Sequence, residues 1–156
     1  MVVRYYNFIY IPMGNFFLVP VNYLAVLLGG VINMALGYLW YGPLYGKEWV
    51  RLTGITPQQR AHNKETMTQR YTLMFLASLV TAYVLFHFIW YAAPGAYTLF
   101  IAVKTALWAW VGLVFPISLT KFLFSADKKP AKLLCIETGY HLVGLVLMAA
   151  VFYLMR

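Results

Sequence analysis

The sequence predicts an all-helical integral membrane protein, a bundle of four transmembrane helices, and three observations lead to that fold class. Four long apolar stretches fill most of the 156 residues. Hydrophobic residues make up 63% of the chain and charged residues only 10%, whereas about a quarter of the residues in a soluble domain are charged. Most basic residues gather in two of the connections between the apolar stretches.

Each apolar stretch is long enough to cross the hydrocarbon core of a membrane, which takes about 20 helical residues. Inside lipid no water can pair with an exposed backbone, so such stretches must be helices. The predicted spans cover residues 21–41, 71–91, 96–122 and 131–155, in a single transmembrane domain over residues 21–156.

Residues 1–20 precede the first span as an aromatic interfacial segment, because Tyr and Phe favour the headgroup region of a membrane. Met13 is an alternative natural start, which leaves open whether residues 1–12 belong to the natural protein. The segment lacks a small-residue cleavage site, so we do not expect it to be a signal peptide.

The basic residues predict the orientation of the bundle. Nine of the twelve Lys and Arg residues lie in or beside the first and third connections, whereas the termini contribute only Arg4 and Arg156. Basic loops stay in the cytoplasm, so we expect both connections at the cytoplasmic face of the inner membrane and both termini outside. The net charge of +8 then serves orientation and contact with anionic lipid headgroups rather than binding of nucleic acid.

The long first connection contains two features of its own. Gly42-Pro43 is expected to stop the first helix, and residues 47–52 suit either a short helix on the membrane surface or a solvated loop. Thr56 and Gln59 have the spacing of a capping box, with Pro57 at the first helical position. A polar helix is therefore expected to begin there and run into the second span.

The third and fourth spans carry one irregular position each. Pro116 removes the backbone hydrogen bond to the carbonyl of Gly112, which predicts a kink in the third span. The kink serves helix packing, or else Gly112 and Pro116 form a hinge. Cys135, the only cysteine, is expected to be a small buried residue of the fourth span.

The most distinctive motif closes the first span and reads Tyr38-Leu39-Trp40-Tyr41-Gly42-Pro43-Leu44-Tyr45-Gly46-Lys47-Glu48-Trp49. With the later segments 52–55, 75–80, 108–112 and 139–143, it resembles a bacterial membrane-protein family called domain of unknown function 1761. The resemblance covers about residue 22 to the end of the chain and implies four transmembrane helices with no assigned activity. The chain departs from the family pattern at Glu137, where members often carry a neutral residue, so no role is carried over to it.

The motif also has a direct physical interpretation. Its aromatic residues suit a collar at the inner membrane interface, its glycines relax the turn, and its lysine meets the headgroups. Structural anchoring competes with ligand binding for this motif. Its main residues are Trp40, Tyr41, Pro43, Gly46, Lys47 and Trp49.

Two charged residues lie inside predicted spans, where charge is costly and often functional. Lys104 lies roughly 12 Å from the outer end of the third span, and Glu137 roughly 9 Å from the inner end of the fourth, at 1.5 Å per residue. They either form an ion pair or snorkel to opposite surfaces, and their helical side-chain directions favour the second arrangement.

His141 follows Glu137 by one helical turn, and Asn33 lies at a similar depth between Gly29 and Gly37 on the first span. We expect these two faces to meet, with Asn33 hydrogen-bonded to His141 or Glu137. The set Asn33, Lys104, Glu137 and His141 then acts as polar glue or, alternatively, as a proton or ion relay. Haem ligation by His87 and His141 is disfavoured because the two histidines differ in depth.

No catalytic constellation, metal-ligand spacing or cofactor motif appears in the sequence, so we expect neither an enzyme nor a bound cofactor. The leading hypothesis is a structural or accessory membrane component that forms a homo-oligomer or joins a larger membrane complex. The alternative is a small oligomeric transporter or channel that uses Glu137, His141 and Lys104. Substrate, partner, oligomeric state and physiological role lie beyond what these residues specify.

Overall fold

The structure is a computed structural model, and it describes residues 19–56, 58–59 and 66–156. All its regular elements are helical, and the described residues contain no strand. The elements in chain order are α1 (Tyr23–Leu39), the π-helical turn η2 (Trp40–Leu44), α2 (Gly46–Thr53), α4 (Met67–Ala92), α5 (Leu99–Ala109), the π-helical turn η3 (Trp110–Val114), α6 (Phe115–Leu123) and α7 (Ala131–Leu154).

Four continuous helices are long and apolar enough to cross a membrane, which confirms the predicted fold class. They run over Tyr23–Leu44, Met67–Ala92, Leu99–Leu123 and Ala131–Leu154. The second begins before its predicted span because the polar start of α4, with Arg70, continues into the apolar part without a break. The aromatic segment 1–18, Pro57 and the polar stretch 60–65 lie outside the described residues.

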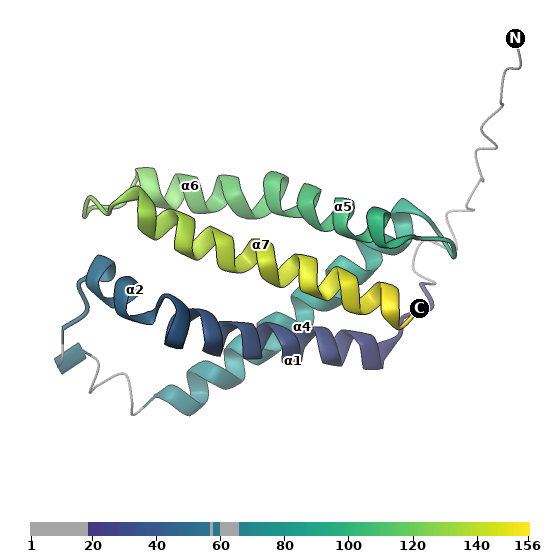
Figure 1. The fold of residues 1–156 in the computed structure, drawn as a ribbon, viewed down its shortest axis with the longest axis horizontal. Helices are drawn as coiled ribbons and strands as arrows, with labels where there is room; N and C mark the ends of the chain where they lie inside the picture. Colours follow the sequence, from purple (N-terminus) through teal and green to yellow (C-terminus); the bar gives the residue numbers. More distant parts are fainter. Residues whose placement is uncertain (1–18, 57, 60–65) are drawn as a thin grey trace, which may run out of the picture.

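Helix α7 lies between α1 on one side and α5 with α6 on the other, and α4 crosses behind (Figure 1). The start of α1, the turn after α4 and the end of α7 lie together at one end of the bundle. Helix α2 and the turn before α7 lie together at the opposite end. This grouping agrees with the predicted pairing of connections, whereas the side of the membrane that each end faces remains a prediction.

The tight part of the core occupies the half of the bundle that contains the end of α7. Phe152 and Met148 of α7 pack there against Leu85 and Ile89 of α4, and all four side chains are fully buried. The Phe152 ring also meets Phe86 edge to face, with centroids 5.3 Å apart. Large side chains from α4 and α7 thus fill much of this half, and α1 contributes Ala25, Val26 and Gly29 beside them.

The first span ends at Leu44, directly after Gly42-Pro43, but these two residues lie inside its last, π-helical turn rather than beyond its end. The helix widens there into the π-turn η2, in which the Tyr45 amide donates to the Trp40 carbonyl at 2.9 Å. Pro43 lies inside η2 and lacks an N–H, so the widened turn carries the chain past it. Gly46 then begins α2, so this segment is a short helix rather than a loop. Its position on the membrane surface stays a prediction.

Pro116 has a similar effect in the third span. The π-turn η3 directly precedes α6, and the Phe115 amide donates to the Trp110 carbonyl. The irregularity predicted near Gly112 and Pro116 therefore takes the form of a π-turn that ends two residues before the proline. Nothing in the structure tests whether it acts as a hinge.

Contacts between the two basic connections close the end of the bundle that holds α2. Lys132 Nζ lies 2.7 Å from Glu48 Oε1, and Lys129 Nζ donates to the Thr53 carbonyl at 3.1 Å. The predicted capping box is also present, since Gln59 N donates to Thr56 Oγ1 and Thr56 N donates to Gln59 Oε1. The first connection is thus tied to α7.

The expectation for Cys135 is wrong, because its side chain is exposed. Its neighbour Ile136 is buried, in a stripe of α7 that also contains Tyr140. A residue one position from a buried helical stripe turns about 100° away from it, so the apolar sequence around Cys135 was a poor guide to its burial.

Candidate functional site

The amide of Asn33 bonds to α4 rather than to α7. Asn33 Nδ2 donates to the Ser78 hydroxyl at 2.9 Å, so the predicted hydrogen bond to His141 or Glu137 is wrong. Helix α4 crosses α1 closely at this depth, and its buried Ser78 offers the nearer acceptor. Ser78 was missed in the sequence, although a small residue four positions before Ala82 signals close helix contact.

The small-residue face of α1 does meet α7, as predicted. A side-chain carbon added at Gly37 would lie 3.4 Å from the Tyr140 hydroxyl, and one at Gly144 would strike the Asn33 side-chain oxygen. The Tyr140 hydroxyl donates to the Asn33 carbonyl at 3.3 Å. Close packing and hydrogen bonds together hold α1 against α7 at this level.

Two tryptophans fix the backbone of α7 on either side of Glu137. Trp40 Nε1 donates to the Ile136 carbonyl at 3.0 Å, and Trp110 Nε1 donates to the Thr138 carbonyl at 2.9 Å. Each of these tryptophans is the first residue of a π-turn: Trp40 begins η2 and Trp110 begins η3. The sequence pointed to Trp40 but missed Trp110, whose position inside a span implied an indole N–H in need of an acceptor.

Glu137 is half-buried between these two anchored carbonyls. It interacts electrostatically with Tyr41 and His141, and within the described part of the chain it forms neither an ion pair nor a hydrogen bond through its side chain. A carboxyl group in a membrane span without a cationic partner can bind a proton or another cation.

Lys104 and Glu137 do not form the ion pair that was one of the two alternatives. Lys104 is exposed on α5, and no salt bridge among the described residues joins it to Glu137. Snorkelling of the lysine toward its nearer membrane surface is the alternative that remains.

His141 lies where the bundle core becomes uncovered. Its side chain is exposed. The residues that follow on the same face of α7 at helical spacing are buried, with exposed fractions of 7% for Leu145, 1% for Met148 and 0% for Phe152. Those three residues share a buried cluster with Leu85, Phe86 and Ile89 of α4. Figure 1 shows that α4 crosses behind the bundle and that its beginning lies away from α7.

The exposure of α4 changes at the same level. Ser78 and Ala82 are buried, whereas Met74 and Tyr71, on the same helical stripe, are 41% and 51% exposed. The half of the bundle on the α2 side of Ser78 therefore leaves Glu137 and His141 of α7 without a covering helix.

The interface motif packs helices together in addition to lying near the end of the span. The Tyr41 ring lies 5.5 Å from Trp49 of α2 and 5.4 Å from Tyr140 of α7 by their centroids. Trp40 meets Tyr45 at 4.8 Å. An aromatic line thus connects α2 to the face that carries Glu137, while Lys47 is exposed at the end of the bundle.

The remaining candidates lie apart from this face. Gly112 has no neighbour within 4 Å of an added side-chain carbon, and Pro116 is exposed. His87 pairs with Tyr83 on its own helix, at 4.3 Å between rings. Among the described residues, no three or more His, Cys, Asp or Glu side chains come together as a metal site.

The comparisons with known proteins identify a family for this chain, and that family has no assigned activity. A family described as "Protein of unknown function (DUF1761)" matches residues 24–153. Neither the curated proteins nor the solved structures contain a match to this chain. The family resemblance of the sequence motifs is thereby confirmed, and the function has to be argued from the site itself.

Proposed function

Because the chain belongs to the family of proteins of unknown function DUF1761, we propose a function from its own geometry: a structural or accessory component of a membrane assembly. In this proposal the protein lies in the cytoplasmic membrane with its two basic connections inside. It works by association with a second copy of itself or with another membrane subunit, and anionic headgroups contact its basic end.

The observation that carries the proposal is the uncovered polar face of α7. His141 is exposed and Glu137 half-buried in the helix Ala131–Leu154, which is long and apolar enough to cross a membrane, so in the proposed location lipid would surround them. Polar and ionisable residues in spans nearly always face protein or water, because lipid cannot pair with them. A helix from another chain, laid over this face, would supply the cover that α4 supplies in the other half of the bundle.

The use of the other intramembrane polar groups supports the same function. Asn33, Ser78, Tyr140 and the two anchoring indoles are all bonded within the bundle, as packing glue would be. The third span is the least buried of the four, so the chain offers a second surface for lipid or protein.

Cross-linking tests the proposal directly. A Cys135→Ser background removes the only cysteine, and His141→Cys then places a single thiol on the uncovered face. We expect this variant to cross-link to a second chain in native membranes. Val80→Cys on the exposed side of α4 (63% exposed) is the matched control for random collisions in the bilayer and is expected to stay monomeric.

Native mass spectrometry of the gently extracted protein identifies the partner. A homo-oligomer or a stoichiometric complex with another subunit supports the proposal. A monomer that also gives no cross-link from position 141 above the Val80→Cys control contradicts it.

Transport is a second candidate, favoured by the unpaired Glu137 beside His141. The pair lies on the uncovered face, where a proton or another cation could reach it from the inner half of the bundle. Proteoliposomes that contain a pH-sensitive dye test this function. Proton uptake that Glu137→Gln abolishes, and that Glu48→Gln at the bundle end retains, would favour transport over a purely structural function.

A further inference from the structure

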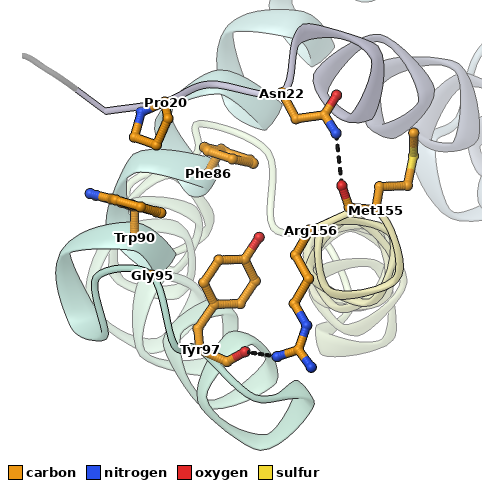
Figure 2. A pocket seen from close by; sticks show the side chains of 8 residues that line it. All are labelled: Pro20, Asn22, Phe86, Trp90, Gly95, Tyr97, Met155 and Arg156. Carbon is orange, nitrogen blue, oxygen red and sulfur yellow. Dashed lines mark hydrogen bonds between the residues drawn. The ribbon is translucent and has the colours of Figure 1, made fainter.

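A cavity of about 520 Å³ opens at the end of the bundle opposite the basic connections (Figure 2). Three segments far apart in the sequence form its walls: the entry to α1, the end of α4 with the following turn, and the end of α7. Sites for small ligands typically enclose about 300–1,000 Å³. The cavity is separate from the face that carries Glu137 and His141, because the buried layer around Phe152 lies between them.

Hydrogen bonds between the three segments hold the rim of the cavity in place. Asn22 Nδ2 donates to the Met155 carbonyl at 2.7 Å, which joins the start of α1 to the end of α7. The buried Tyr97 donates its hydroxyl to the Phe152 carbonyl at 3.0 Å, which joins the turn to α7. A rim held in this way needs little ordering when a ligand binds.

Arg156 supplies the charge of the site. One of its guanidinium N–H groups donates to the Tyr97 carbonyl, and its Cζ lies 4.5 Å from the centroid of the Tyr153 ring. Figure 2 shows its side chain along the cavity wall. Among the described residues no side-chain carboxylate forms an ion pair with it. A guanidinium has five N–H donors, so most of them remain for an oxyanion from outside the chain.

Apolar side chains complete the site beside this cation. Phe86, Trp90 and Met155 line the cavity near the ends of α4 and α7. If these two helices span a membrane, as their length and composition allow, their ends lie close to its surface. A ligand that satisfies both parts has an oxyanion joined to hydrocarbon. At a membrane surface that chemistry belongs to phospholipids, whose phosphates pair with arginine while their chains run along apolar residues.

We propose that this cavity binds an anionic phospholipid, with the phosphate oxygens on Arg156 and the first part of an acyl chain along Phe86 and Trp90. The site lies at the end of the bundle that carries few basic residues. It is therefore distinct from contact between headgroups and the lysines of the opposite end.

Fluorine NMR of the full chain with 5-fluorotryptophan tests the proposal. The five tryptophans give separate probes, and Trp90→Phe assigns the resonance of Trp90. In phosphatidylcholine nanodiscs we expect this resonance to shift when phosphatidylglycerol is included. Arg156→Gln should weaken binding about tenfold, the size expected for loss of a charged hydrogen bond, while Arg156→Lys retains part of it.

Two controls distinguish lipid binding at Arg156 from lipid contact at the basic end and from binding of free phosphate. Lys128→Gln removes one positive charge at the other end and should leave the Trp90 shift unchanged. Inorganic phosphate added to phosphatidylcholine nanodiscs should not produce the shift. The proposal is overturned if Arg156→Gln needs no more phosphatidylglycerol than the wild type to produce the shift, if Lys128→Gln weakens the shift equally, or if inorganic phosphate alone reproduces it. Unchanged resonances of the other four tryptophans show that Arg156→Gln is folded.

Discussion

Individual polar residues inside the bundle fall into two groups with different consequences. Asn33, Ser78 and Tyr140 have partners within the chain, so their removal is expected to affect stability. Glu137 and His141 form no side-chain hydrogen bond or ion pair with the described residues, so their removal is expected to affect association or cation binding more than the stability of the single chain. The distinction follows from where each side chain points, because all five lie in sequence that is equally apolar.

The Asn33–Ser78 hydrogen bond gives a quantitative prediction. Asn33→Ala and Ser78→Ala should each lower the free energy of unfolding, and a double-mutant cycle should give a coupling of about 0.6 kcal/mol and at most about 1.7 kcal/mol, the range for such bonds in membranes. Unfolding in mixed detergent micelles measures it. Thr81→Ala is the control, because that hydroxyl is exposed and bonds only to Ala77 of its own helix. Additive effects of the two variants would show that the bond contributes nothing.

At the scale of helices and turns, η2 and α2 determine how the first connection packs against α7. The π-turn at Trp40–Leu44 places Trp40 against α7 and then allows α2 to fold back to Lys132. Gly46 lies so close to Tyr41 that a side-chain carbon added at Gly46 would be 2.5 Å from the Tyr41 carbonyl oxygen. This oxygen belongs to the backbone, so it cannot move away as a flexible side chain could.

Gly46→Ala is therefore expected to destabilise the protein by about 1–3 kcal/mol, the typical cost of overpacking. Gly42→Ala, four residues earlier in η2, has no atom within 4 Å of the added carbon and is expected to be neutral or slightly stabilising. Thermal unfolding in detergent compares the two variants. Equal stability of Gly46→Ala and Gly42→Ala would mean that the turn can relax without cost.

The link between α2 and α7 should weaken in acid. Hydrogen bonds from Arg51 and Lys132 lower the pKa of Glu48 from 4.5 to about 2. Because the pKa in the folded state is the lower one, the stabilisation is complete above pH 4.5 and is lost as the pH falls toward 2. Stability measured over this range should fall more steeply for the wild type than for Glu48→Gln, in which the other carboxyl groups still titrate. Parallel curves would contradict a role for Glu48 in the link.

The whole molecule presents two chemically different ends. Lys129, Lys132 and α2 gather at one end, whereas Tyr97 and Arg156 close the other around the cavity of Figure 2. By the positive-inside rule, the basic end is predicted to face the cytoplasm. The arrangement of the helices makes both basic connections share one side, and the charge then predicts which side it is.

Labelling with a membrane-impermeant maleimide measures this orientation. In the Cys135→Ser background, Ala96→Cys in the turn after α4 should label from outside intact cells, and Lys128→Cys should label only after the membrane is opened. Both positions are exposed, so a difference in labelling reports sidedness. The reverse pattern would place both termini inside and invert the proposed orientation.

The sequence by itself determined the fold class, the number of spans and the family, because the length of an apolar stretch and the order of motifs are local properties. It also indicated that the small-residue face of α1, with Gly29, Asn33 and Gly37, packs against the fourth span, since residues three or four apart share a helical face.

The tertiary structure alone decided which partner each polar group has. The choice of Ser78 over His141 for Asn33, and the uncovering of His141, both depend on where α4 crosses the bundle and diverges. A crossing angle arises from packing between helices far apart in the sequence, and no periodicity within one helix records it. The same reason explains why the Arg156 cavity, formed by three distant segments, had no signal in the sequence.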